Sequence, residues 1–145
     1  MTGKAGLKAG AIGAAVMLVP GLINHLLPIA ENAALTYTLC GVSMAVYAAT
    51  GVLAGFFLAR PRTPGKGAGA GAIAGLISGI FYGGLGFIMI ATGFSSILAS
   101  AQVRQAIEQG ISPMILAVVG ITCNPILGSA LAAIGGAIFA AVKPD

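Results

Sequence analysis

The stretch that decides the fold is "GAGAGAIAGLISGIFYGG", residues 67–84. Residues four apart lie on one face of an α-helix, and here that face carries only glycine. Glycine inside a water-exposed helix costs about 1 kcal/mol relative to alanine, so this row would destabilise a soluble helix. The spacing therefore indicates a helix in a solvent other than water. The row consists of Gly67, Gly71, Gly75, Gly79 and Gly83.

The composition of the chain identifies that solvent as a lipid bilayer. Of its 145 residues, 58% are hydrophobic and only 7% are charged, whereas typical globular domains have about 25% charged residues. The mean hydropathy is +1.03. So few charges cannot form a water-exposed surface, which indicates an integral membrane protein. Because the basic residues form no contiguous patch, we expect no nucleic-acid partner.

Four apolar runs are each long enough to cross the bilayer as a helix, which takes about 20 residues. They cover residues 9–29, 35–59, 69–96 and 114–142. Apolar and polar residues do not alternate within them, as they would in the strands of a membrane barrel. The sequence therefore predicts an all-α fold: an integral membrane four-helix bundle that forms one transmembrane domain over residues 1–145.

The connections between these runs predict two tandem helical hairpins. Residues 30–34 join the first two spans tightly, and "RPRTPGKG" at 60–67 stops the second span with its prolines. The connection at 99–113, which includes "AQVRQAIEQGISP", is expected to hold a short interfacial helix before the fourth span. The tetrapeptide "AGAI" occurs at 9–12 and again at 70–73, so either one hairpin was duplicated or the match is due to chance.

The distribution of basic residues predicts the orientation of the chain. Lys4 and Lys8 precede the first span, and the Arg60–Lys66 loop carries three further basic residues. Basic residues concentrate in cytoplasmic loops, so we expect both termini and this loop to be cytoplasmic. The first run is long and lacks a clear cleavage site, so we expect a retained span rather than a cleaved signal peptide.

The glycine row is interpreted as a surface for helix packing. Helices in lipid associate through close backbone approach, which small residues permit. The partner of the row is left open between the first span, the fourth span and a second copy of the chain, with packing inside one chain favoured. A homo-oligomer or a larger membrane complex therefore stays an alternative. Further packing positions are Gly51 and Gly55 in the second span, and Gly128 and Gly136 in the fourth.

Polar residues inside the spans are candidates for function, because burying them in lipid is costly. Asn24 and His25 lie near the end of the first span, with Glu31 shortly after it. A histidine can change its charge near neutral pH, with Glu31 as its partner. The alternative interpretation places His25 and Glu31 in the headgroup region, where they are solvated and have no role.

Two prolines lie inside spans and are predicted to kink their helices. Pro20 lies in the first span, and Pro125 follows Asn124 in the fourth. Asn124 or Thr122 is expected to hydrogen-bond the carbonyl that Pro125 frees at Ile121, although a solute or ion site at Asn124 is the alternative. Broken helices form binding sites in transporters, which makes the two kinks together a candidate site.

The chain lacks the side-chain sets of standard catalysis. It has three acidic residues and one histidine, so a paired-carboxylate mechanism, a histidine-based triad and a metal cage would each lack parts within one chain. The segment "GAGAGAIAG" resembles a dinucleotide-binding motif, but no strand precedes it and no acidic residue follows at the required distance. We therefore expect no enzyme activity, no cofactor and no metal. Cys40 and Cys123 lie at different depths, which argues against a disulfide.

Taken over the whole chain, the two hairpins, the glycine-rich third span and the loop "RPRTPGKGAGAG" resemble uncharacterised families of small four-span, glycine-rich membrane proteins from archaea and bacteria. This resemblance implies the architecture and a prokaryotic cell (plasma) membrane, and it implies no catalytic residues. Two functions follow as hypotheses. The first is a non-catalytic scaffold or accessory subunit of a membrane assembly, and the second is a small oligomeric channel or transporter for a small solute or ion.

Overall fold

The computed structural model describes residues 2–27 and 32–144. These residues form four long helices and two short ones, with no strand among them. The predicted all-α fold class is therefore confirmed, and each long helix is long and apolar enough to span a membrane. The elements are α1 (Thr2–Leu26), α2 (Ala33–Phe56), α3 (Pro64–Ala91), the 3-10 helix η2 (Ser96–Ala99), α4 (Ala101–Glu108) and α5 (Pro113–Val142).

The helices begin earlier than the hydropathy of the sequence indicates. Helix α1 starts at Thr2 rather than near residue 9, because Lys4 and Lys8 lower the hydropathy without interrupting the helix; both are exposed. Helix α3 starts at Pro64, where the Thr63 side chain accepts a hydrogen bond of 3.3 Å from the backbone N–H of Lys66. Such caps set the start of a helix independently of its apolar pattern.

The connection from α3 to α5 carries the expected short surface helix. Helix α4 has no buried residue, as befits a segment at the edge of the bundle. Ser112 then caps α5 by accepting a 3.2 Å hydrogen bond from the N–H of Met114, and Pro113 occupies the first turn. A proline is tolerated there because that N–H would have no helical partner.

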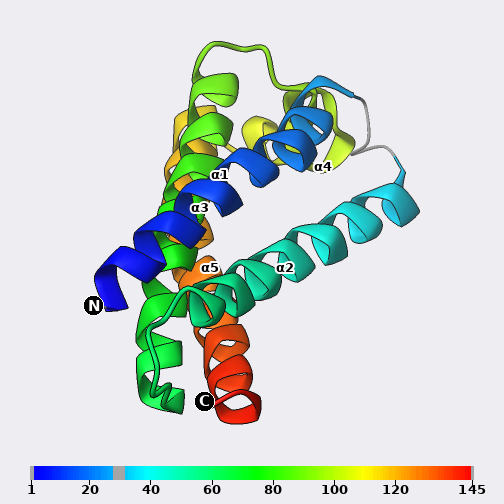
Figure 1. Ribbon diagram of the computed structural model, residues 1–145. Coiled ribbons are helices and arrows are strands. Elements are labelled where there is room, and N and C mark those ends of the chain that lie inside the picture. Colours follow the sequence, from blue (N-terminus) through cyan, green and yellow to red (C-terminus); the bar gives the residue numbers. More distant parts are fainter. Residues whose placement is uncertain (1, 28–31, 145) are drawn as a thin grey trace.

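Figure 1 shows how the long helices are arranged. Helices α3 and α5 run antiparallel and lie side by side, while α1 packs against α3, α2 packs against α5, and both cross the central pair at an angle. Both chain termini and the connection from α2 to α3 lie at one end of the bundle, called the terminal end below. The opposite end, called the η2 end, carries η2 and α4 (Figure 1).

The glycine row of α3 faces the backbone of α5 along its whole length. A Cβ added at Gly79 would lie 2.5 Å from the Cα of Pro125, and one at Gly83 would lie 2.9 Å from the Cα of Ile121. No side chain fits at such distances, so the two backbones touch directly. The facing pairs are Gly67 with Gly136, Gly71 with Ala132, Gly75 with Gly128, Gly79 with Pro125 and Gly83 with Ile121.

Close contacts of the same kind join the outer helices to the central pair at the terminal end. A Cβ at Gly6 of α1 would lie 2.7 Å from the carbonyl oxygen of Ala70, and Gly51 of α2 faces the carbonyl of Ala132. Gly55 lies against the ring of Phe139. The buried core there consists mainly of alanine: Ala5, Ala9, Ala54, Ala70 and Ala74, together with Leu58.

Arg62 closes the terminal end. Its backbone N–H donates to the carbonyl of Pro144 at 2.9 Å, and its guanidinium donates to the carbonyls of Phe56 and Lys143 at 3.2 and 3.3 Å. The guanidinium carbon also lies 5.6 Å from the centre of the Phe139 ring, within the range of a cation–π interaction. One side chain thus joins the end of α2 to the end of α5.

Candidate functional site

The η2 end is less tightly packed than the terminal end, chiefly because of α2. Residues 33–45 of this helix are all exposed except for Leu39 and Ser43, which are half-buried. A Cβ added at Gly41 would meet nothing within 4 Å, whereas one at Gly51 would collide with α5. The first half of α2 therefore stands away from the central pair and leaves a wedge-shaped space.

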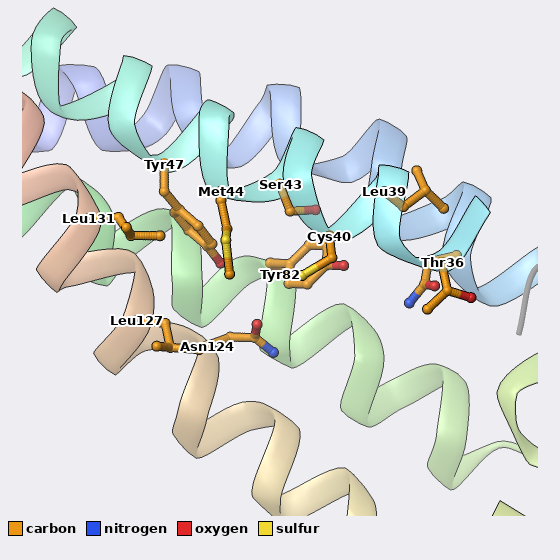
Figure 2. A pocket seen from close by; sticks show the side chains of 11 residues that line it. Thr36, Leu39, Cys40, Ser43, Met44, Tyr47, Tyr82, Asn124, Leu127 and Leu131 are labelled. Atoms are coloured by element: carbon orange, nitrogen blue, oxygen red, sulfur yellow. The ribbon is translucent and has the colours of Figure 1, made fainter. Parts of the chain in front are cut away.

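This space, called the wedge cavity below, lies between α2, α3 and α5, is also lined by Asn24 of α1, and has a volume of about 220 Å³ (Figure 2). An apolar cavity of roughly 150 Å³ is enough to hold benzene, so the wedge cavity can take a molecule of ring size. Leu39, Leu127 and Leu131 form apolar parts of its wall. Its hydrogen-bonding side chains are Asn24, Thr36, Ser43, Tyr47, Tyr82 and Asn124.

A second cavity, called the η2 cavity below, has a volume of about 280 Å³ and adjoins the first. It lies beneath η2, which contributes Ile97, and is also lined by His25 and Gly86. Both cavities share the same three polar side chains, which stand between them. These are Asn24, Tyr82 and Asn124.

Tyr47 carries a buried polar atom that lacks a hydrogen-bond partner. The residue is only 4% exposed, and its hydroxyl has no hydrogen-bond partner among the described residues. The ring lies so close to α5 that a Cβ on Gly128 would be 2.7 Å from its Cε1 atom. A buried hydroxyl without a partner costs about 1–3 kcal/mol, a cost that a hydrogen bond to a bound molecule would offset. Tyr82, across the cavity, shares a side-chain hydrogen bond with Ser43.

Asn124 lines both cavities, but it does not cap the carbonyl that sequence reasoning assigned to it. Its side-chain amide donates to the carbonyl of Gly120 at 2.8 Å, and Thr122 donates to Val118 at 2.8 Å. The expectation that one of them bonds Ile121 was therefore wrong, because each side chain reaches back four residues along its own helix.

The prolines expected to kink the first and fourth spans lie inside unbroken helices. Helix α1 continues through Pro20 and α5 through Pro125, and both prolines are buried. The backbone of Pro125 packs against Gly79. The wedge cavity therefore arises from the separation of α2 from the central pair, and no broken helix forms it.

His25 is buried rather than solvated. It is 5% exposed, and its Nδ1 lies 2.8 Å from the Oγ of Ser95. The hydroxyl of Ser96 donates to the carbonyl of Leu27 at 2.5 Å. These two hydrogen bonds join the end of α1 to η2, so the alternative of a solvated His25 was wrong. Its expected partner, Glu31, lies outside the described residues.

Sequence reasoning missed the polar face of α2. Thr36, Cys40, Ser43 and Tyr47 are spaced by four, three and four residues, a spacing that puts them on one face of a helix. All four line the wedge cavity. Cysteine and tyrosine are counted among the hydrophobic residues of the composition, which hid this pattern, but a search for hydroxyl and thiol groups at helical spacing would have found it.

The lining contains no Asp, Glu, Lys or Arg among the described residues, whereas hydrogen-bonding groups are plentiful. The described residues also hold no group of three His, Cys, Asp or Glu side chains that could bind a metal ion. The fold and the cavity define a multi-pass membrane protein with four candidate spans and a polar space between them. Comparisons with protein-family models, with curated proteins and with solved structures gave no match.

Proposed function

We propose that this membrane protein binds a small uncharged molecule in the wedge cavity, as a small channel or transporter does. The observation that supports this proposal most strongly is the buried, unpaired hydroxyl of Tyr47 at a cavity lined by other hydrogen-bonding groups. Because the described lining carries no acidic or basic side chain, an uncharged ligand suits it better than an ion. Asn24, Tyr82 and Asn124, which line both cavities, are the residues expected to contact it.

The packing of the bundle closes the wedge cavity towards the terminal end. Gly51 of α2 lies against the backbone of Ala132 in α5, so no space continues between these two helices there. Transporters alternate between states that open to opposite sides, often by moving one helical bundle against another. The α1–α2 hairpin is the part expected to move, because the first half of α2 has few neighbours.

A scaffold or accessory subunit is the second candidate function. It is favoured by the exposed first half of α2, where Tyr37 is 77% and Leu35 is 49% exposed. A helix in this position offers a face to a partner chain or to a second copy. In that case the wedge cavity binds a helix or a side chain of the partner.

Thermal unfolding in mild detergent with a panel of uncharged molecules, from water-soluble polyols to lipid-soluble ring compounds, tests the proposal. A ligand raises the unfolding temperature in proportion to its binding free energy. We expect at least one class to stabilise the wild type and not an Asn124→Leu variant, with Cys123→Ser as a control outside the cavity. Members of that class that cross lipid slowly should then pass into liposomes holding the protein. If no compound stabilises the wild type and a protein partner co-purifies, the scaffold is correct.

We further propose that the protein resides in a prokaryotic plasma membrane with both termini and the Arg60–Lys66 loop in the cytoplasm. Six of its seven basic residues lie in these segments or beside them, in agreement with the positive-inside rule. A C-terminal green fluorescent protein should fluoresce, and alkaline phosphatase fused after Gly110 should be active. The opposite pair of results would show the reverse orientation.

A further inference from the structure

We infer that the ligand of the wedge cavity is an uncharged, lipid-soluble molecule of ring size that accepts a hydrogen bond from Tyr47 and enters sideways from the bilayer. This inference rests on the proposed function, because it names the class of molecule that the proposed site takes. Three features of the cavity support it: where it opens, which donor it leaves unused, and how large it is.

The cavity is bordered by exposed apolar side chains of the two helices that flank it. Met44 of α2 is 47% exposed and Leu127 of α5 is 53% exposed, and both line the cavity (Figure 2). Both residues lie well inside candidate membrane spans, so this border faces hydrocarbon rather than water. A molecule dissolved in the lipid reaches the cavity directly between α2 and α5, without crossing a loop.

Among the fully buried side-chain polar atoms of the described residues, one hydroxyl at the cavity has no hydrogen-bond partner. The side chains of Tyr82 and Ser43 interact with each other, and one N–H of the Asn124 amide donates to the carbonyl of Gly120. The hydroxyl of Tyr47 has no partner among the described residues. A phenol hydroxyl donates well to a carbonyl oxygen, so the ligand should carry such an acceptor. Met44 lines the same cavity, and methionine is flexible enough to adjust to a ligand.

The volume and charge of the cavity limit the ligand further. About 220 Å³ exceeds the roughly 150 Å³ that holds benzene, which leaves room for one substituted ring. The described lining offers no ionised group to pair with a charge, and an unpaired charge in an apolar site is costly. A ring that bears carbonyl oxygens, as a quinone does, meets all of these conditions.

Two probes of matched shape test the inference. Tetramethyl-1,4-benzoquinone carries two carbonyl acceptors, while 1,2,4,5-tetramethylbenzene lacks them; full substitution of the quinone ring leaves no free position for addition of the Cys40 thiol. Binding to the detergent-solubilised protein is measured by titration calorimetry and thermal shift. We expect the quinone to bind more tightly than the hydrocarbon, by roughly three- to tenfold for one net hydrogen bond.

The variant Tyr47→Phe keeps the ring and removes only the hydroxyl. It should lose this three- to tenfold preference, leave hydrocarbon binding unchanged, and raise the unfolding temperature of the free protein, because an unpaired buried hydroxyl is removed. Tyr37→Phe is the matched control on the same helix, since Tyr37 is 77% exposed and lies outside the cavity lining. It should bind both probes as the wild type does.

The outcomes separate this inference from the proposed function. Equal binding of the two probes, or an unchanged preference in Tyr47→Phe, would overturn the role of Tyr47 as the donor. Binding of polyols that depends on Asn124, with no binding of either ring compound, would overturn lipid-side entry and leave the proposed function standing. If no polyol and neither ring compound binds, both are wrong.

Discussion

The terminal end and the η2 end of this bundle are built from the same kinds of residues but pack in opposite ways. At the terminal end, Gly51, Gly67 and Gly71 each face a backbone of α5, so no space is left between the helices. At the η2 end, the first half of α2 has few neighbours, and the wedge cavity and the η2 cavity lie next to each other. A glycine brings helices together only where a partner backbone lies opposite it.

The solvent explains why this difference is tolerated. In water, an exposed apolar helix face would collapse onto the bundle, because burying apolar surface is favourable. In lipid that driving force is absent between helices, and close packing decides which helices touch. Helix α2 is therefore held at Gly51 and Gly55 and is free to diverge near Gly41, where no neighbour lies within 4 Å.

A leucine at Gly75 should have the largest effect, because it breaks the contact between α3 and α5. Its side chain would have to displace the backbone of α5 at Gly128, and overpacking of this kind costs more than about 3 kcal/mol. The matched change Gly69→Leu lies on the same helix and meets nothing within 4 Å. Size-exclusion profiles and circular dichroism in detergent should show loss of the folded protein for Gly75→Leu alone. Equal tolerance of both variants would show that α3 and α5 do not pack as described.

A pair of alanine substitutions in α2 compares the two ends directly. Gly51→Ala should lower the free energy of unfolding by about 1–3 kcal/mol, because its Cβ would collide with the backbone of Ala132. Gly41→Ala should leave stability unchanged or raise it slightly, since the site is open and alanine favours helix. Unfolding titrations in mixed micelles measure both. A larger loss for Gly41→Ala would mean that the first half of α2 has a partner.

The hydrogen bond between His25 and Ser95 should contribute less than these backbone contacts. A double-mutant cycle with His25→Ala and Ser95→Ala should give a coupling of about 1 kcal/mol, typical of one buried hydrogen bond. The single variants should also speed proteolysis near η2, because this bond and that of Ser96 hold η2 to α1. Additive effects in the cycle would mean that the two side chains do not interact.

Ser78→Ala should have the smallest effect. The serine is fully buried in α3, but its hydroxyl donates to the carbonyl of Ala74 in the same helix at 2.7 Å. Such local bonds add little to stability, so we expect a change below about 0.5 kcal/mol by the same titration. A loss above 2 kcal/mol would indicate that this hydroxyl joins helices, and that shape alone does not hold α3 in place.

The all-α fold class could be predicted from the sequence, because a long apolar run that crosses lipid must form a helix unless it belongs to a closed barrel. It could not select α5 as the partner of the glycine row, since small residues recur in all four spans and only the three-dimensional arrangement decides which rows meet. Helix starts were misplaced near Lys4 and Lys8 because hydropathy and helix formation are different properties.

The candidate site was foreseen in part. Asn24, His25 and Asn124 were singled out as intramembrane polar groups, and all three line the η2 cavity. Their role in binding stays a prediction. Tyr47 and Ser95 were not singled out. The pairing of His25 with Ser95 joins positions 70 residues apart, and tyrosine is counted among the hydrophobic residues of the composition.

Arg62 has a consequence for how the protein sits in its membrane. Its guanidinium binds carbonyls at the ends of α2 and α5, where the helix dipoles place partial negative charge. Arginine keeps its positive charge in proteins and is costly to move into hydrocarbon. Arg62 therefore stays at the membrane–water interface and fixes the depth of the ends of α2 and α5 together. A bilayer of different thickness must then be accommodated at the opposite end of the bundle.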